Sequence, residues 1–143
     1  MKKTLILFVF TILGICVNAQ KLYKVSNIQG GVYNKYQKKW DWGKTEEVDL
    51  TITLFGNNIY VNDEAQTHIT TYEDLGEKIS YDDDGDKYRM HTWRAVDEKQ
   101  RRCLFTMVFY MTIDLEVYTV IYSDFGFRYY ISNKGLDKFK SKP

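Results

Sequence analysis

The stretch Val48-Asp49-Leu50-Thr51-Ile52-Thr53-Leu54 decides the fold class of this chain. Its even-numbered positions are apolar and its odd-numbered positions are polar. Because successive side chains of a strand point to opposite faces, a period of two is typical of a sheet with one buried face and one wet face. The stretch is therefore predicted to be a half-buried β-strand.

Similar apolar runs, rich in aromatic and β-branched residues, follow one another along the chain with short polar or glycine-containing turns between them. No segment keeps the 3.6-residue period of a helix, and the one proline is Pro143. We therefore predict an all-β fold, an antiparallel meander of about eight or nine strands that closes into a small barrel or a sandwich. The expected strands are residues 22–28, 48–54, 59–61, 67–72, 79–81, 87–96, 101–112, 117–122 and 127–131.

Residues 1–19 have the features of a signal peptide. Two lysines precede an apolar run, Leu5 through Val17, and Ala19 is a suitable residue before a cleavage site. The run is too short to span a bilayer, which takes about 20 apolar residues. We expect an exported protein, periplasmic or extracellular. Cys16 leaves a second interpretation open, in which it is the lipid-anchored cysteine of a bacterial lipoprotein.

Cleavage after Ala19 would leave one β-domain, residues 20–132, and a basic tail, residues 133–143. The cleaved chain would carry 18 basic and 19 acidic side chains, so it lacks the basic excess that nucleic-acid binding requires. Its one cysteine, Cys103, cannot form an intramolecular disulfide. We expect Cys103 to be a buried, inert thiol, because its neighbours are apolar.

The stretch Asp82-Asp83-Asp84-Gly85-Asp86 is the nearest approach to a chemical motif. An EF-hand loop needs glycine at its sixth position and glutamate at its twelfth, and counting from Asp82 puts Lys87 and Trp93 there. Asp84-Gly85 is instead a favoured pair for a two-residue type I′ hairpin turn. We predict the hairpin. A calcium-binding corner of another kind remains the alternative, because clustered carboxylates repel one another without a cation.

Four aromatic residues are the candidate ligand-binding residues: Trp40, Trp42, Tyr110 and Tyr122. Trp40 and Trp42 are two positions apart and share one face if the chain is extended there, beside lysines. Such a pair can stack on a sugar or an aromatic ring, or it can close one end of a barrel or sandwich. Tyrosines of the C-terminal strands, Tyr110 and Tyr122 among them, can line a concave site or form ladders between strands.

No catalytic motif is present. The two histidines, His68 and His91, have no spacing typical of a metal site, and we predict no metal and no cofactor. A hydrolase with paired carboxylates leaves no local signature, and His91 with Cys103 could form a nucleophilic pair if the strands bring them together. A hydrolase is therefore kept as the third functional hypothesis, and we predict that the protein is not an enzyme.

The signal ending Asn18-Ala19-Gln20, the run Trp93-Arg94-Ala95-Val96-Asp97, Cys103 and the segment from Tyr122 to Tyr130 resemble features of small exported β-proteins of the Bacteroidota. These proteins have no assigned activity. The resemblance implies a location and a style of fold, and it implies no site residues.

The leading functional hypothesis is a non-enzymatic module that binds a small or extended ligand through its aromatic surface. The second hypothesis is a cell-envelope or secreted interaction protein whose partner is another protein. A flat apolar patch beside an unpaired edge strand would favour that second hypothesis, since a partner could add a strand there.

Overall fold

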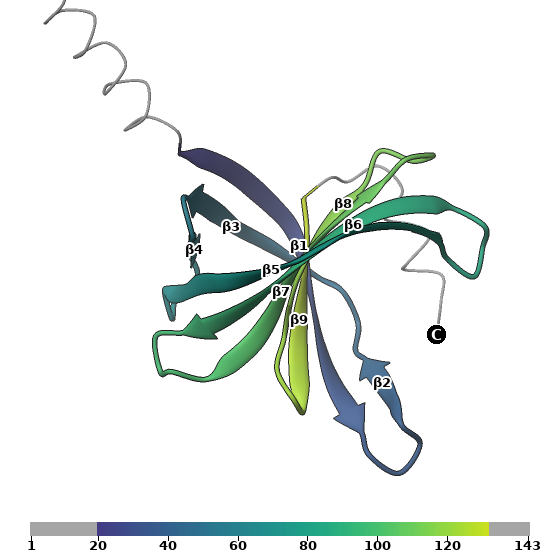
Figure 1. Ribbon diagram of the computed structural model, residues 1–143, viewed down its shortest axis with the longest axis horizontal. Coiled ribbons are helices and arrows are strands. Elements are labelled where there is room, and N and C mark those ends of the chain that lie inside the picture. The colour runs from purple at the N-terminus through teal and green to yellow at the C-terminus, as the bar shows by residue number, and fades with distance from the viewer. Residues whose placement is uncertain (1–19, 132–143) are drawn as a thin grey trace, which may run out of the picture.

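Residues 20–131, which the computed structural model describes, form nine strands in one antiparallel sheet and contain no helix (Figure 1). The prediction of an all-β antiparallel fold is therefore confirmed. The strands are β1 (Lys21–Asn34), β2 (Lys39–Trp42), β3 (Glu46–Phe55), β4 (Asn58–Val61), β5 (Thr67–Tyr81), β6 (Lys87–Asp97), β7 (Arg102–Tyr110), β8 (Glu116–Ile121) and β9 (Phe125–Tyr130).

The strand pairings close into a ring. From β3 to β9 each strand pairs with the next one along the chain, and β1 pairs with both β3 and β9. Eight strands thus form a continuous circuit, which agrees with the barrel-like form of the prediction better than with a two-layer sandwich. Strand β2 lies outside the circuit and pairs with the last four residues of β1, Gly31–Asn34.

The inside of the ring is filled by side chains. Its core cluster includes Val25, Ile52, Phe105, Tyr118 and Tyr129, each no more than 4% exposed. The stretch 48–54 behaves as its alternation predicts, because its even-numbered apolar residues belong to this core or pack against it. A ligand therefore has to be sought on the outer face of the ring or at its ends.

The alternation of inward and outward side chains in β1 shifts by one residue between Val25 and Asn27. The pairing of β1 with β3 is irregular at this point. Val25 lies in the core, and Ile28, only three residues later, also packs against the core. Directly paired residues point to the same face. Since Gln29 pairs with Arg128 and Ile28 pairs with the buried Tyr129, Gln29 and Arg128 belong to the outer face.

The hairpin of β5 and β6 extends well beyond β4, whereas β7 pairs with β6 from Tyr88 to Val96 (Figure 1). Strand β4 pairs only with Thr67–Thr70, so residues 72–81 have β6 on one side and no strand on the other among the described residues. Two ion pairs, Glu73–Arg94 and Glu77–Arg89, and a hydrogen bond between His91 and Asp74 join the two long strands. The pairing is irregular twice here, and Gly76 has φ of 90°.

Three hairpins turn with the same hydrogen bonds, and each begins with an aspartate: Asp63, Asp82 or Asp97. In each, the aspartate carbonyl accepts from the N–H three residues later, and its carboxylate accepts from the N–H four residues later. The third residue after each aspartate has positive φ: Gln66 49°, Gly85 83° and Gln100 62°. This is a type I turn followed by a left-handed residue, a common three-residue hairpin loop.

The stretch 82–86 is therefore a hairpin corner, as predicted, but the predicted turn type is wrong. A type I′ turn requires positive φ at both Asp84 and Gly85, and only Gly85 has it. The reason is the Asp82 carboxylate, which accepts from the N–H groups of both Asp84 and Asp86 and holds a wider turn.

The predicted signal segment with Cys16, and the basic tail from residue 133, lie outside the described residues. Within residues 20–131 no helix is long and apolar enough to cross a membrane.

Candidate functional site

Trp40 and Trp42 lie on one face of β2, as their spacing predicts, and their rings stack with centroids 5.5 Å apart. Tyr33 continues the aromatic row, 5.5 Å from Trp40. The row depends on Gly31, which pairs with Trp42. A Cβ at Gly31 would lie 2.5 Å from Cε3 of Trp42, so only glycine lets the indole lie this close to β1.

Arg128 of β9 lies against this row. Its guanidinium carbon is 3.7 Å from the centroid of the Trp42 ring, which is a close cation–π contact. It also donates a hydrogen bond to the amide oxygen of Gln29 at 3.3 Å. Among the described residues, no carboxylate lies within ion-pair distance of Arg128.

Gln29 organises the polar side of the site. Its amide oxygen accepts from the Tyr130 hydroxyl at 2.8 Å as well as from Arg128, and its amide nitrogen donates to the Gly43 carbonyl at 2.6 Å. Gly43 directly follows Trp42, so one side chain fixes both the position of the tryptophan strand and that of the arginine. Gln29 is 9% exposed; its bond to Tyr130 is buried, and its bonds to Arg128 and Gly43 are partly buried.

Burial lowers the pKa of Arg128 from its ordinary value, because a charged guanidinium loses water there; the Tyr130 hydroxyl acts in the opposite direction. Burial likewise raises the pKa of Tyr110 to about 12. A partly dehydrated cation with aromatic and amide neighbours attracts an anion more strongly than an exposed arginine does.

Tyr110 lies on the outer face near Arg128. It packs against a second apolar cluster that contains Leu115, Val117 and the fully buried Tyr130. Arg128 and Tyr110 interact electrostatically. The structure therefore brings three of the four sequence-predicted residues, Trp40, Trp42 and Tyr110, to the surroundings of one arginine.

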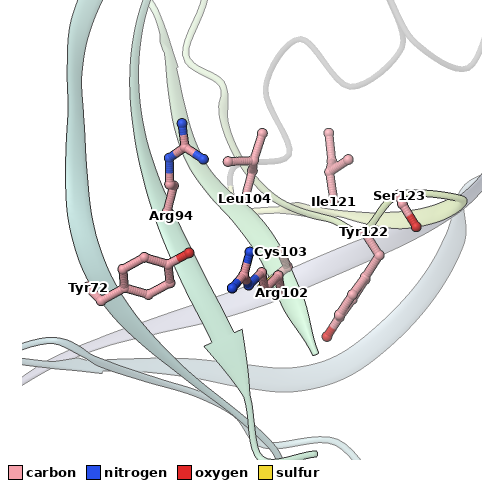
Figure 2. A pocket seen from close by; sticks show the side chains of 8 residues that line it. All are labelled: Tyr72, Arg94, Arg102, Cys103, Leu104, Ile121, Tyr122 and Ser123. Atoms are coloured by element: carbon pink, nitrogen blue, oxygen red, sulfur yellow. The ribbon is translucent and has the colours of Figure 1, made fainter. Parts of the chain in front are cut away.

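An open groove of about 240 Å³ adjoins this region on the outer face (Figure 2). Leu104 and Ile121 project to the same side of the sheet, and the Tyr72 ring reaches toward the arginines Arg94 and Arg102. Arg94 is paired with Glu73, whereas no described carboxylate is within ion-pair distance of Arg102. The lining contains no acidic residue: Tyr72, Arg94, Arg102, Cys103, Leu104, Ile121, Tyr122 and Ser123.

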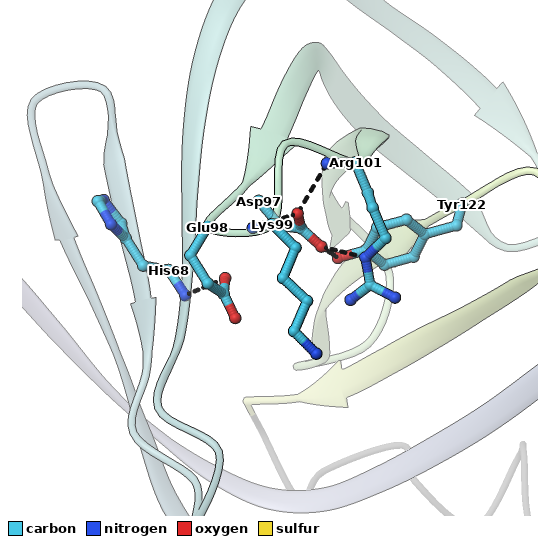
Figure 3. Close-up of polar contacts among 6 residues, drawn as sticks. All are labelled: His68, Asp97, Glu98, Lys99, Arg101 and Tyr122. Carbon is cyan, nitrogen blue, oxygen red and sulfur yellow. Dashed lines mark hydrogen bonds and ion pairs between the residues drawn. The ribbon is translucent and has the colours of Figure 1, made fainter.

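The fourth predicted residue, Tyr122, lines this groove and also has a structural role. Its hydroxyl donates to the Asp97 carboxylate at 2.9 Å, and its ring stacks on Phe125 beneath the Arg101 guanidinium (Figure 3). The Asp97 side chain is fully buried and also accepts from Arg101 Nε at 2.7 Å and from the N–H groups of Lys99 and Arg101. Tyr122 is 7% exposed, and its bond to Asp97 joins the ends of β8 and β6 at one end of the ring of strands.

Cys103 and His91 do not meet. Cys103 pairs with Ala95 and His91 pairs with Met107, so they lie four positions apart along the strands. Cys103 is buried, and burial raises the pKa of its thiol to about 11, as an inert cysteine requires. His91 instead stacks on Trp93 at 3.9 Å and bonds to Asp74 at 2.6 Å on the long hairpin.

No group of three or more histidine, cysteine, aspartate or glutamate side chains in residues 20–131 is arranged to hold a metal ion. In the corner 82–86, the Asp82 carboxylate accepts from two backbone N–H groups and the Asp86 carboxylate accepts from the Thr112 hydroxyl. The Asp82 carboxylate therefore shapes the hairpin, and the Asp86 carboxylate joins it to the turn between β7 and β8.

Sequence reasoning missed Arg128, Gln29 and Gly31. The signals were present: Arg128 is the one charged residue in the aromatic strand Phe125–Tyr130, and Gly30-Gly31 interrupts a strand without ending it. A glycine inside a strand often marks a place where another group approaches the backbone closely.

Comparison with protein-family models, with curated proteins and with solved structures found no match to this chain. The resemblance to small exported proteins of the Bacteroidota therefore stays a prediction.

Asp97→Ala should lower the free energy of unfolding by about 3 kcal/mol, because it leaves buried donors without their charged acceptor. Chemical denaturation measures the change. Lys99→Ala is the matched control, since that side chain is exposed in the same turn, and it should change the stability by less than about 0.5 kcal/mol. Equal losses in the two variants would contradict the role given to Asp97.

The contribution of Asp97 should disappear in acid. Its burial favours the protonated form, but hydrogen bonds from Arg101, Tyr122 and Lys99 outweigh burial and lower the pKa of Asp97 below its ordinary value of 3.8. A lowered folded-state pKa gives stability that is present above the unfolded-state pKa and lost as the pH falls through the folded-state pKa. The difference between the wild type and Asp97→Ala should therefore shrink from about pH 5 to about pH 2; a constant difference would refute this.

Gly31→Ala should separate the tryptophan pair, because the new methyl group would occupy the space of the Trp42 ring. We expect loss of the far-ultraviolet exciton couplet of the stacked indoles in circular dichroism and a destabilisation of about 1–3 kcal/mol. Gly30→Ala is the control, since a Cβ there meets nothing within 4 Å. An unchanged signal in Gly31→Ala would mean that the indoles do not depend on this close approach.

Proposed function

We propose that this protein is a non-enzymatic binding module for an anionic ligand that carries a ring. The observation that carries the proposal is Arg128, which is partly buried against Trp42 and has no carboxylate within ion-pair distance among the described residues. Removing an arginine from water without a counter-charge is unfavourable, so its retention beside stacked indoles is best explained by an anion that arrives from outside.

The chemistry of the neighbours supports a ligand with two parts. A guanidinium offers a fork of donors that matches a carboxylate or a phosphate. The indoles of Trp40 and Trp42 stack on each other and Arg128 covers the Trp42 ring, so the half-exposed parts of the two indoles beside the guanidinium are what a sugar or an aromatic ring can contact. No nucleophile lies beside a base at this site. The hydrogen bonds among Gln29, Tyr130 and Arg128 hold the arginine in place, as a binding site needs.

The second candidate function is protein binding by strand addition at β5. It is favoured by the unpaired edge of residues 72–81, where Tyr72, Leu75, Ile79 and Tyr81 are exposed. Against it stand the two irregularities in pairing and the charged residues Glu73, Asp74, Glu77 and Lys78, which are the devices that protect an edge from pairing. Ligand binding at Arg128 is therefore the better-supported function.

The test uses two acids and their neutral counterparts: galacturonate with galactose, and benzoate with benzamide. Tryptophan fluorescence should change on titration with an acid and much less with its neutral counterpart. Arg128→Gln should weaken binding of the acid at least about tenfold, since a hydrogen bond to a charged group is worth about 1.5–3 kcal/mol. Arg89→Gln, which removes an exposed arginine of the long hairpin, should leave binding unchanged.

The proposal fails if neither acid binds better than its neutral counterpart, or if Arg128→Gln binds the acid as well as the wild type does. A loss of equal size in Arg89→Gln would show that the effect is one of general surface charge.

A further inference from the structure

The groove of Figure 2 and the Arg128 site are neighbours on one face of the sheet. Leu104 pairs with Ile121, Ile121 pairs with Gly126, Gly126 pairs with Gly31, and Gly31 pairs with Trp42. Directly paired residues share a face. These five residues therefore form one row across β7, β8, β9, β1 and β2.

The row is open between its two ends. The Trp42 ring lies over Gly31, so Gly126 is the one remaining residue between Ile121 and the indole. Gly126 has no side chain to close the path. Arg128 pairs with Thr119, two residues before Ile121, so Ile121 and Arg128 are diagonal neighbours, about 7–8 Å apart at Cα.

The two ends carry like charge. Arg128 lies at one end, and Arg102, with Ser123 near it, lies at the other; Arg94, also at that end, is paired with Glu73. No acidic residue lines the groove, and among the described residues no carboxylate forms an ion pair with Arg102 or with Arg128. A ligand that matches both ends has to carry at least two anionic groups.

The middle of the row suits a chain of rings better than a peptide. An added peptide strand pairs with free main-chain groups at a sheet edge, whereas this row crosses the middle of a sheet whose main-chain groups pair with the neighbouring strands. Recognition on such a face depends on side chains: the indoles, Leu104 and Ile121 for ring faces, and the guanidiniums for acid groups.

We infer that the ligand is an acidic oligosaccharide, with a uronate at Arg128 and a second uronate at Arg102. Arg128 is level with Thr106 of β7, four residues from Arg102, so the two arginines are about 13 Å apart along the strands and about 10 Å apart across them. Their Cα atoms are therefore about 16 Å apart, a length of three or four sugar rings. This inference rests on the proposed function, because the uronate at Arg128 is the anion of that proposal.

The experiment compares calorimetric titrations of the purified protein with tetragalacturonate, galacturonate and the neutral maltotetraose. The tetramer should bind at least tenfold more tightly than the monomer, and maltotetraose should bind more weakly than the tetramer. Arg102→Gln should remove most of the gain of the tetramer over the monomer and leave the monomer unchanged. Arg128→Gln should weaken both acids.

The results distinguish failure of the second subsite from failure of the proposed function. If Arg102→Gln binds the tetramer as tightly as the wild type, or if the tetramer binds no better than the monomer, the inference of a second subsite is wrong and the proposed function stands. If Arg128→Gln changes neither acid, the proposed function itself is wrong. Tighter binding of a ten-residue glutamate peptide than of the tetramer would overturn the choice of a saccharide.

The control is Arg89→Gln, an exposed arginine outside the row, which should bind both acids as the wild type does. Denaturation curves of Arg102→Gln should match those of the wild type, because Arg102 is exposed and has no ion pair with a described residue. If the Arg89→Gln and Arg102→Gln proteins bind the tetramer equally weakly, the tetramer binds through general surface charge. This result would overturn the inference.

Discussion

The pairing of β1 with three other strands is the constraint on which the structure depends. One edge of β1 holds β3 along its first half and β2 along its second half, and the other edge holds β9. The ring closes because β9 returns to β1. The shift in side-chain direction after Val25 then turns Gln29 and Gly31 to the outside, where they meet Arg128 and Trp42. The closure of the ring and the assembly of the binding surface are therefore consequences of the same strand.

Much of the fold could be predicted because its signals are local. The alternation in residues 48–54 and most polar breaks between apolar runs indicated the strands and their meander order. The two strands predicted at 67–72 and 79–81 are one strand, β5, because the polar residues between them stay paired with β6, and β2 was not predicted. A further local signal was present and unused: Asp63-Glu64-Ala65-Gln66-Thr67 and Asp97-Glu98-Lys99-Gln100-Arg101 share the pattern Asp-Glu-x-Gln-x and form the same corner as residues 82–86. The ring itself could not be predicted, because closure joins β1 to β9 across about a hundred residues of sequence.

The candidate site was predicted in part for the same reason. Trp40 and Trp42 share a face through a spacing of two, which is local, and the structure confirms the shared face, on which the two rings stack. Tyr122 lines the groove, but its bond to Asp97, 25 residues away, could not be predicted, because nothing near Tyr122 in the sequence marks it as a structural anchor. Arg128 was missed because its significance depends on the lack of a described carboxylate beside it. That lack is seen only in the folded structure.

The lack of a described carboxylate beside Arg128 has a thermodynamic consequence. The free protein contains a dehydrated positive charge, and an anion that supplies the missing charge stabilises the folded state and not the unfolded chain. Such an anion raises the free energy of unfolding by about 2.7 kcal/mol at a concentration 100 times its dissociation constant. The melting temperature is then a direct reporter of occupancy, so a collection of acids can be screened by heating the protein with each of them.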